Sequence, residues 1–217
     1  MGIQEYLTLK KEAEYEIVIK KSKFIANVKP VSTLKEAEEF ISKIKKRYYD
    51  ATHNTYAFTV GLEAEEVQKS NDDGEPSGTA GKPILEVIKM KNLKNTVVVV
   101  TRYFGGILLG AGGLIRAYSE SAREGIEKAG ITKMIRCEKY LVSLNYQNFN
   151  RIERFFKEKG FIIKGIEYKE TVNLEVLRPY YLPLTVEEVL TKMCILDKRV
   201  KLIGEGFEEI VDNKFIM

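Results

Sequence analysis

Residues that most often carry chemistry are scarce in this chain. Its 217 residues include one histidine, two cysteines and no tryptophan. Cys137 and Cys194 lie far apart and form no Cys-x-x-Cys motif, so we interpret both as reduced, buried structural thiols. With so few ligands, we expect no zinc site and no cofactor. Any catalysis that uses histidine would depend on His53 alone.

Long hydrophobic runs are also absent. The densest apolar stretch, residues 97–100, has the length of a strand, whereas a membrane helix needs roughly 18 apolar residues. The first residues mix both charges and have no apolar signal core, so we expect a cytoplasmic protein without membrane contact. The net charge of +4 is weak. Three local basic clusters fit solvated faces as well as they fit binding surfaces: Lys20, Lys21 and Lys23; Lys43, Lys45, Lys46 and Arg47; Lys89, Lys91 and Lys94.

Hydrophobic periodicity predicts an α+β protein of two small domains, residues 1–134 and 135–217. In the first domain we expect strands at 15–19, 23–28, 55–60, 65–70 and 96–103, and helices at 33–48, 83–90 and 114–129. The valines of 96–103 indicate a central strand that is buried on both faces. In the second we expect strands at 138–144, 161–168, 171–177 and 201–208, and helices at 147–159 and 184–195. That β-α-β-β-α-β order is typical of the ferredoxin-like split unit.

The most specific feature is a glycine-rich surface between Asp72 and Arg116. Two segments build it, NDDGEPSGTAGK at 71–82 and TRYFGGILLGAGGLIRAY at 101–118. Each precedes a predicted helix, so exposed amides and a positive helix end would favour an anion. Arg102 and Arg116 flank the second segment and are suited to bidentate contacts with phosphate or carboxylate. The alternative is that the glycines serve only tight turns and close packing.

Enzymatic interpretations have weaker support. His53, Asp72 or Asp73, and Ser77 supply the residue types of a catalytic triad, but GEPSG is not a Gly-x-Ser-x-Gly elbow. The nucleotide-binding loops do not match either, because Ala111 and Gly112 stand where a phosphate-binding loop needs lysine and serine or threonine. Acidic residues at 72, 73 and 75 suit a hard cation, although aspartate beside glycine more often forms a turn.

Several segments closely resemble those of the YigZ/IMPACT family. They are NDDGEPSGTAGKPIL, VVVVTRYFGGILLGAGGLIRAYSE, KSKF with Lys23 and Phe24, and ATHNTYAF with His53. The resemblance covers nearly the whole chain. It implies a first domain similar in fold to a ribosomal-protein domain and to the fourth domain of elongation factor G, and a second similar to the fifth domain of that factor. Eukaryotic IMPACT regulates translation with an additional N-terminal RWD domain, so the resemblance does not supply its protein partner.

Together these observations predict a non-catalytic protein that binds nucleic acid or the ribosome and regulates translation. Two alternatives remain open: a protein-binding translation or stress regulator without RNA contact, and an enzyme acting on an anionic small molecule. The oligomeric state is left open. The residues expected to line one anion-binding cleft are Lys23, His53, Asp73, Glu75, Ser77, Gly78, Thr79, Arg102, Tyr103, Gly105, Gly106, Gly112, Gly113 and Arg116, with backbone amides and arginines taking phosphates and Tyr103 or Phe104 stacking on a base.

Overall fold

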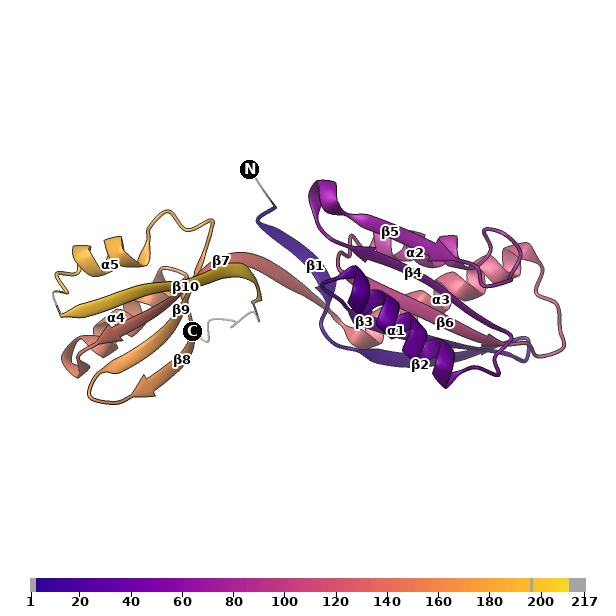
Figure 1. Ribbon diagram of the computed structural model, residues 1–217, viewed down its shortest axis with the longest axis horizontal. Coiled ribbons are helices and arrows are strands. Elements are labelled where there is room, and N and C mark those ends of the chain that lie inside the picture. Colours follow the sequence, from indigo (N-terminus) through magenta and orange to yellow (C-terminus); the bar gives the residue numbers. More distant parts are fainter. Residues whose placement is uncertain (1–2, 196, 211–217) are drawn as a thin grey trace. The chain divides into compact units, whose positions relative to one another are not determined.

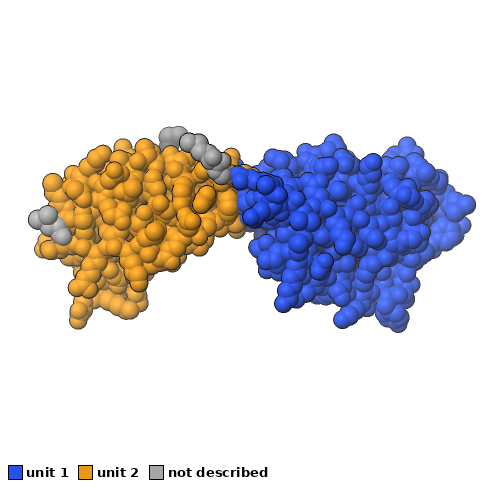
Figure 2. All heavy atoms as spheres, turned by 45° about the horizontal axis from the view of Figure 1, so that its top comes forward, with its two compact units in different colours: residues 1–2, 6–133 blue, residues 3–5, 134–217 orange. Residues whose placement is uncertain are grey.

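The computed structural model describes residues 3–195 and 197–210, which fall into two compact units. Among these residues, unit 1 comprises 6–133, and unit 2 comprises 3–5 with 134–195 and 197–210 (Figure 2). Both units are mixed α+β, and each contains an antiparallel sheet. No helix among the described residues is long and apolar enough to cross a membrane.

Unit 1 is built on a five-stranded sheet with the order β2-β3-β6-β4-β5 (Figure 1). Its strands are β2 (Ala13–Ile19), β3 (Ser22–Pro30), β4 (His53–Val60), β5 (Val67–Asn71) and β6 (Thr96–Tyr103). Its helices are α1 (Leu34–Arg47), α2 (Gly81–Met90) and α3 (Ala111–Ala129), with a short 3-10 turn η1 at Glu63–Glu65. The predicted central strand is therefore confirmed, because β6 lies in the middle of the sheet.

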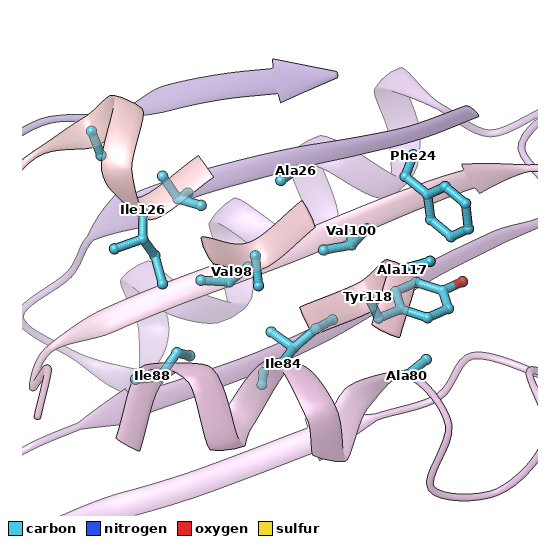
Figure 3. Close-up of a cluster of buried hydrophobic side chains, with 14 of the residues drawn as sticks. Phe24, Ala26, Ala80, Ile84, Ile88, Val98, Val100, Ala117, Tyr118 and Ile126 are labelled. Carbon is cyan, nitrogen blue, oxygen red and sulfur yellow. The ribbon is translucent and has the colours of Figure 1, made fainter. Parts of the chain in front are cut away.

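Helices cover both faces of this sheet. Val97 and Val99 pack with the buried face of α1, whereas Val98 and Val100 pack with α2 and α3. All four valines are fully buried, as expected for a strand covered on both sides. Figure 3 shows the second of these cores, in which Tyr118 of α3 lies beside Phe24 of β3. Burying this apolar surface is the main favourable term in the folding of unit 1.

Unit 2 contains the predicted β-α-β-β-α-β order. It consists of β7 (Ile131–Leu144), α4 (Tyr146–Glu158), β8 (Ile162–Tyr168), β9 (Val172–Pro179), α5 (Val186–Lys192) and β10 (Lys198–Glu209). The sheet path runs β1-β7-β9-β8, and β10 also pairs with β7. The strand β1 (Glu5–Leu9), most of which belongs to unit 1, was not predicted, because its short sequence EYLTL shows no clear alternation and is followed by two lysines.

The two cysteines differ in their environment. Cys137 on β7 is buried, as expected, and burial raises its pKa to about 11. Cys194 is exposed, so the expectation that both thiols are buried was wrong. Cys194 follows the C-cap of α5 and has a positive φ of 55°, so it belongs to the turn that ends the helix rather than to its buried face.

Candidate functional site: the glycine-rich surface of unit 1

The strand register brings the two glycine-rich segments to one end of the unit 1 sheet. Arg102 on β6 lies opposite His53 on β4 and Phe24 on β3, and the next β6 residue, Tyr103, lies opposite Lys23. The turn between β2 and β3, the end of β6 and the start of α3 lie at this same end (Figure 1). Residues far apart in the sequence therefore meet here because β6 pairs with both neighbouring strands.

A buried polar network lies beneath this surface. The guanidinium Nη1 of Arg102 is 2.6 Å from Oε1 of Glu75, which also accepts a 2.7 Å hydrogen bond from the hydroxyl of Tyr118. The side chains of Arg102 and Glu75 are only 6% and 3% exposed. Burial, followed by the hydrogen bond to Glu75, raises the pKa of Tyr118 far above its usual value. Arg102 thus faces an internal carboxylate, whereas the sequence had suggested an external phosphate.

The start of α2 is already occupied by a side chain of the protein. The carboxylate of Asp72 accepts hydrogen bonds from the amides of Gly78 (2.8 Å), Ala80 (3.0 Å) and Gly81 (2.8 Å). A carboxylate at this position satisfies the free amides and complements the positive end of the helix. The helix consequently begins at Gly81, two residues before Pro83. The expectation that α2 offers its amides to an external anion is not met in this arrangement.

Asp73 and His53 form a second polar group beside Asp72. The carboxylate of Asp73 accepts 2.7 Å and 2.5 Å hydrogen bonds from the Asn54 amide and the Lys45 ammonium. Burial acts to raise the pKa of Asp73, but these bonds outweigh it and the pKa is lowered. His53 Nδ1 lies 2.7 Å from the main-chain oxygen of Asp73, and its Nε2 lies 3.9 Å from Glu75 Oε1. The imidazole therefore bridges the loop that carries both acidic residues.

The described residues do not bring together a catalytic triad or a cluster of metal ligands in this segment. Ser77 is exposed, and no described contact joins it to His53. Thr79 is buried and donates its hydroxyl to the main-chain oxygen of Pro76 at 2.6 Å. The carboxylates at 72, 73 and 75 each have different internal partners, and the described residues contain no group of three or more potential metal ligands.

The start of α3, in contrast, is open. Gly110 precedes the helix with a φ of 71° and supplies no side-chain cap. A Cβ atom placed on Gly106, Gly110 or Gly112 would meet nothing within 4 Å. Among the described residues, no side chain caps the first amides of α3. Arg116, one turn further along the helix, is exposed and makes no ion pair among the described residues.

A lysine-rich turn packs against the beginning of the loop that leads from β6 to α3. Lys20 and Lys21 connect β2 to β3 with φ values of 47° and 64°, and both side chains are exposed. A Cβ atom on Gly105 would lie 2.0 Å from the carbonyl carbon of Lys21, so only glycine allows this approach. The Gly105 amide donates to the hydroxyl of Ser22 at 3.1 Å. This contact, which sequence reasoning missed, places two cations beside the glycine loop.

The aromatic residues at the end of β6 complete the surface. The hydroxyl of Tyr103 donates to Asp50 at 2.7 Å, and this bond is the main reason that its pKa rises to about 12. The ammonium of Lys23 lies 5.3 Å from the centre of the Tyr103 ring and 3.7 Å from Glu16. Phe104 is 45% exposed. Of the predicted site residues, Ser77, Gly106, Gly112 and Arg116 are exposed, whereas Lys23 and Tyr103 are half-buried. Gly113 is instead packed closely, because a Cβ atom added to it would lie 2.9 Å from the Leu109 side chain.

Comparison with known proteins agrees with this architecture. Residues 20–126 match the family model described as the Impact N-terminal domain. IMPACT family member YvyE of Bacillus subtilis is 50% identical over 173 residues, which cover 80% of this chain and 79% of YvyE. IMPACT family member YigZ of Escherichia coli is 32% identical over 162 residues, covering 74% and 79% of the two chains.

A solved structure extends the similarity across both units. The crystal structure of a hypothetical protein has a TM-score of 0.61 and 27% sequence identity, and the match covers 93% of this chain and 98% of that one. The fold and the glycine-rich surface thus define a two-unit α+β protein with an Impact N-terminal domain. The chain belongs to the IMPACT family.

Proposed function

We propose that this chain is a binding protein that regulates translation in the cytoplasm and contacts RNA or the ribosome through the surface around the start of α3. Membership of the IMPACT family supports the link to translation. The family resemblance also underlies our proposal that unit 1 is similar to the fourth domain of elongation factor G. For unit 2 we propose a ferredoxin-like fold, which the β-α-β-β-α-β order from β7 to β10 supports.

One observation carries the RNA proposal: the Lys20–Lys21 turn packs against Gly105, in the same loop that leads to the uncapped start of α3. Lysines at the surface attract phosphates without regard to sequence, and free helix amides can donate to the same groups. Tyr103 and Phe104 add aromatic rings on which an unpaired base can stack. The phosphate contacts thus come from Lys20, Lys21 and α3, with Arg102 holding the surface in place from beneath.

The backbone of the lysine turn permits a test that separates charge from stability. Both lysines have left-handed φ values, which cost a non-glycine residue about 1 kcal/mol or more. Asparagine and glycine are the residues that such a two-residue hairpin turn prefers. We therefore expect the double variant Lys20→Asn/Lys21→Gly to melt at a higher temperature than the wild type and yet to bind RNA more weakly.

The measurement is fluorescence anisotropy of a labelled single-stranded RNA 20-mer, titrated with the full chain at several KCl concentrations. Loss of two phosphate contacts should reduce the slope of log affinity against log salt by about 1.4. The variant Lys10→Gln/Lys11→Gln removes the same charge at another exposed lysine pair of unit 1 and serves as the control. Equal losses in both variants, or a wild-type affinity that does not respond to salt, would contradict the proposal.

A second candidate function is supported by exposed apolar side chains in the same loop. Phe104, Ile107 and Leu108 are 45%, 41% and 82% exposed, and such side chains more often contact protein than phosphate. This alternative would be favoured if the chain retained a bound partner protein after nuclease treatment and the Leu108→Ser variant did not. If nuclease treatment alone released the partner protein, the alternative would be excluded.

A further inference from the structure

A second surface of unit 1 lies on the opposite face of the sheet. The α1–β5 groove, as we call it, has a volume of about 460 Å³ between α1 and the strands β4 and β5. Its lining residues are Glu38, Ile41, Ser42, Lys45, Lys46, Tyr49, Tyr56, Phe58 and Lys69. Ile41 and Phe58 belong to the core beneath α1, so the groove has an apolar floor. His53 and Arg102 face the other side of the sheet, so the groove opens on a different face, and Lys45 connects its rim to Asp73 of the glycine-rich segment.

The strand that borders the groove has a free edge. β5 is the last strand of the sheet and, among the described residues, pairs with β4 alone; all five of its residues are exposed. Helix α1 packs mainly on β4 and β6. Outside the ladder with β4, residues 67–71 make no backbone–backbone hydrogen bond among the described residues. The outward amides and carbonyls of residues 67–70 are therefore available to another extended chain, whereas Gly81 of α2 packs against the backbone of Asn71.

The charged residues of the groove lining are three lysines and one glutamate, Glu38, a balance that favours an acidic partner. Lys69 lies opposite Phe58 in the strand register, so its side chain projects on the face that holds the groove. Lys46 and Lys69 are exposed and make no ion pair among the described residues, whereas Lys45 is bound to Asp73. A second copy paired symmetrically about Lys69 would place two lysines opposite each other, which is unfavourable. The edge of β5 is therefore better suited to pairing with an acidic strand than to pairing with β5 of a second copy.

The aromatic residues of the groove argue for a peptide over RNA. Phe58 is only 1% exposed, and the ammonium of Lys45 lies 5.7 Å from the centre of the Tyr56 ring. Tyr56 and Phe58 also lie parallel, with ring centres 6.5 Å apart. Tyr49, which is 85% exposed, is the one aromatic ring of the lining that remains open for stacking. A nucleic-acid strand would also leave the free backbone groups of β5 unused.

We propose that the α1–β5 groove and the edge of β5 together bind an extended acidic segment of a partner protein, which joins the sheet as a sixth strand. Main-chain hydrogen bonds to β5 hold the segment. Its acidic side chains meet Lys46 and Lys69, and an apolar side chain enters the groove over Ile41 and Phe58. This binding is independent of RNA contact at the glycine-rich surface.

The test uses a random octapeptide display library selected on the full chain. We expect the enriched peptides to alternate acidic and apolar residues. Hydrogen–deuterium exchange with a synthetic enriched peptide should show new protection at residues 67–71. The variant Lys69→Glu should weaken that peptide at least tenfold. Lys35→Glu is the matched control, because the Lys35 side chain is 85% exposed on α1 and does not line the groove.

Three results would overturn the proposal. The selection could enrich no family of related peptides, it could enrich peptides without acidic residues, or the enriched peptide could bind the Lys69→Glu variant as tightly as the wild type. If a poly(U) 15-mer protected residues 67–71 from exchange, and Lys69→Glu abolished that protection, the groove would be a nucleic-acid surface instead. A dimer that forms through β5, detected by the same exchange protection without peptide, would assign the edge to a second copy of the chain.

Discussion

The ion pair between Arg102 and Glu75 leads to the sharpest prediction about unit 1. Both side chains are almost fully buried, and Glu75 also accepts from Tyr118. Arg102→Ala would leave a buried carboxylate without its cation. Breaking a buried pair in this way typically costs about 3–5 kcal/mol of unfolding free energy, a large share of the roughly 5–15 kcal/mol that stabilises a typical domain. For a unit of this size, we expect the melting temperature to fall by roughly 10–20 °C.

Replacing both partners should be far less harmful. In Arg102→Met/Glu75→Leu no buried charge remains, and the chief loss is the acceptor of the Tyr118 hydroxyl, worth about 1–3 kcal/mol. We therefore expect the double variant to be more stable than Arg102→Ala. The double variant also keeps the comparison possible if the single variant does not fold.

Calorimetry and urea unfolding followed by circular dichroism would measure these differences on the full chain. RNA anisotropy on the same samples, at a temperature where each is folded, would measure binding. If Arg102→Ala lost less than about 1 kcal/mol while its RNA affinity fell sharply, the guanidinium would be a ligand-binding group, and the structural role argued from its burial would be refuted.

Two further predictions concern the same surface. Gly105→Ala should destabilise unit 1 because its Cβ would lie 2.0 Å from the backbone of Lys21, whereas Gly112→Ala, in open space within α3, should stabilise it by about 0.5–1 kcal/mol; thermal melts of the pair that show equal effects would contradict the close approach. Because the pKa of Asp73 is lowered in the folded protein, its contribution is complete above its unfolded pKa of about 3.9 and is lost as the pH falls through the lower folded value. Asp73→Asn should therefore reduce stability at pH 7 and flatten the acid limb of the stability curve, and an unchanged acid limb in urea titrations would show that Lys45 and Asn54 do not hold the carboxylate.

The elements of this protein follow closely from local patterns. Thr33 caps α1 by accepting from the Glu36 amide, and Gly130 ends α3 with a φ of 72°; both residue types are typical of these helix positions. In β9, apolar residues alternate along the sequence, and Val172, Leu174 and Val176 form one buried face. β1 was not predicted, because a five-residue strand with little periodicity depends on its pairing partner for its structure.

The candidate site was less predictable, because charge and hydrogen bonding depend on neighbours that are distant in the sequence. Glycine spacing located the surface, but it could not show that Asp72 caps α2 or that Glu75 neutralises Arg102. It also could not show that the turn at Lys20 and Lys21 reaches Gly105. Of the groups expected to bind an anion, Arg102 is paired with Glu75 and the start of α2 is capped by Asp72. We therefore propose the lysines of the β2–β3 turn as the phosphate-binding groups.

By itself, the sequence determined the α+β character of both units, the doubly covered central strand and the position of the glycine-rich segments, because these depend on periodicity and on the conformational range of glycine over a few residues. Only the tertiary structure decided which polar groups remain free to bind a ligand. A carboxylate or guanidinium is available only if no partner already binds it. The packing of α3 and of the loop between β5 and α2 around the end of β6 brings Tyr118, Glu75 and Arg102 together from three separate parts of the chain.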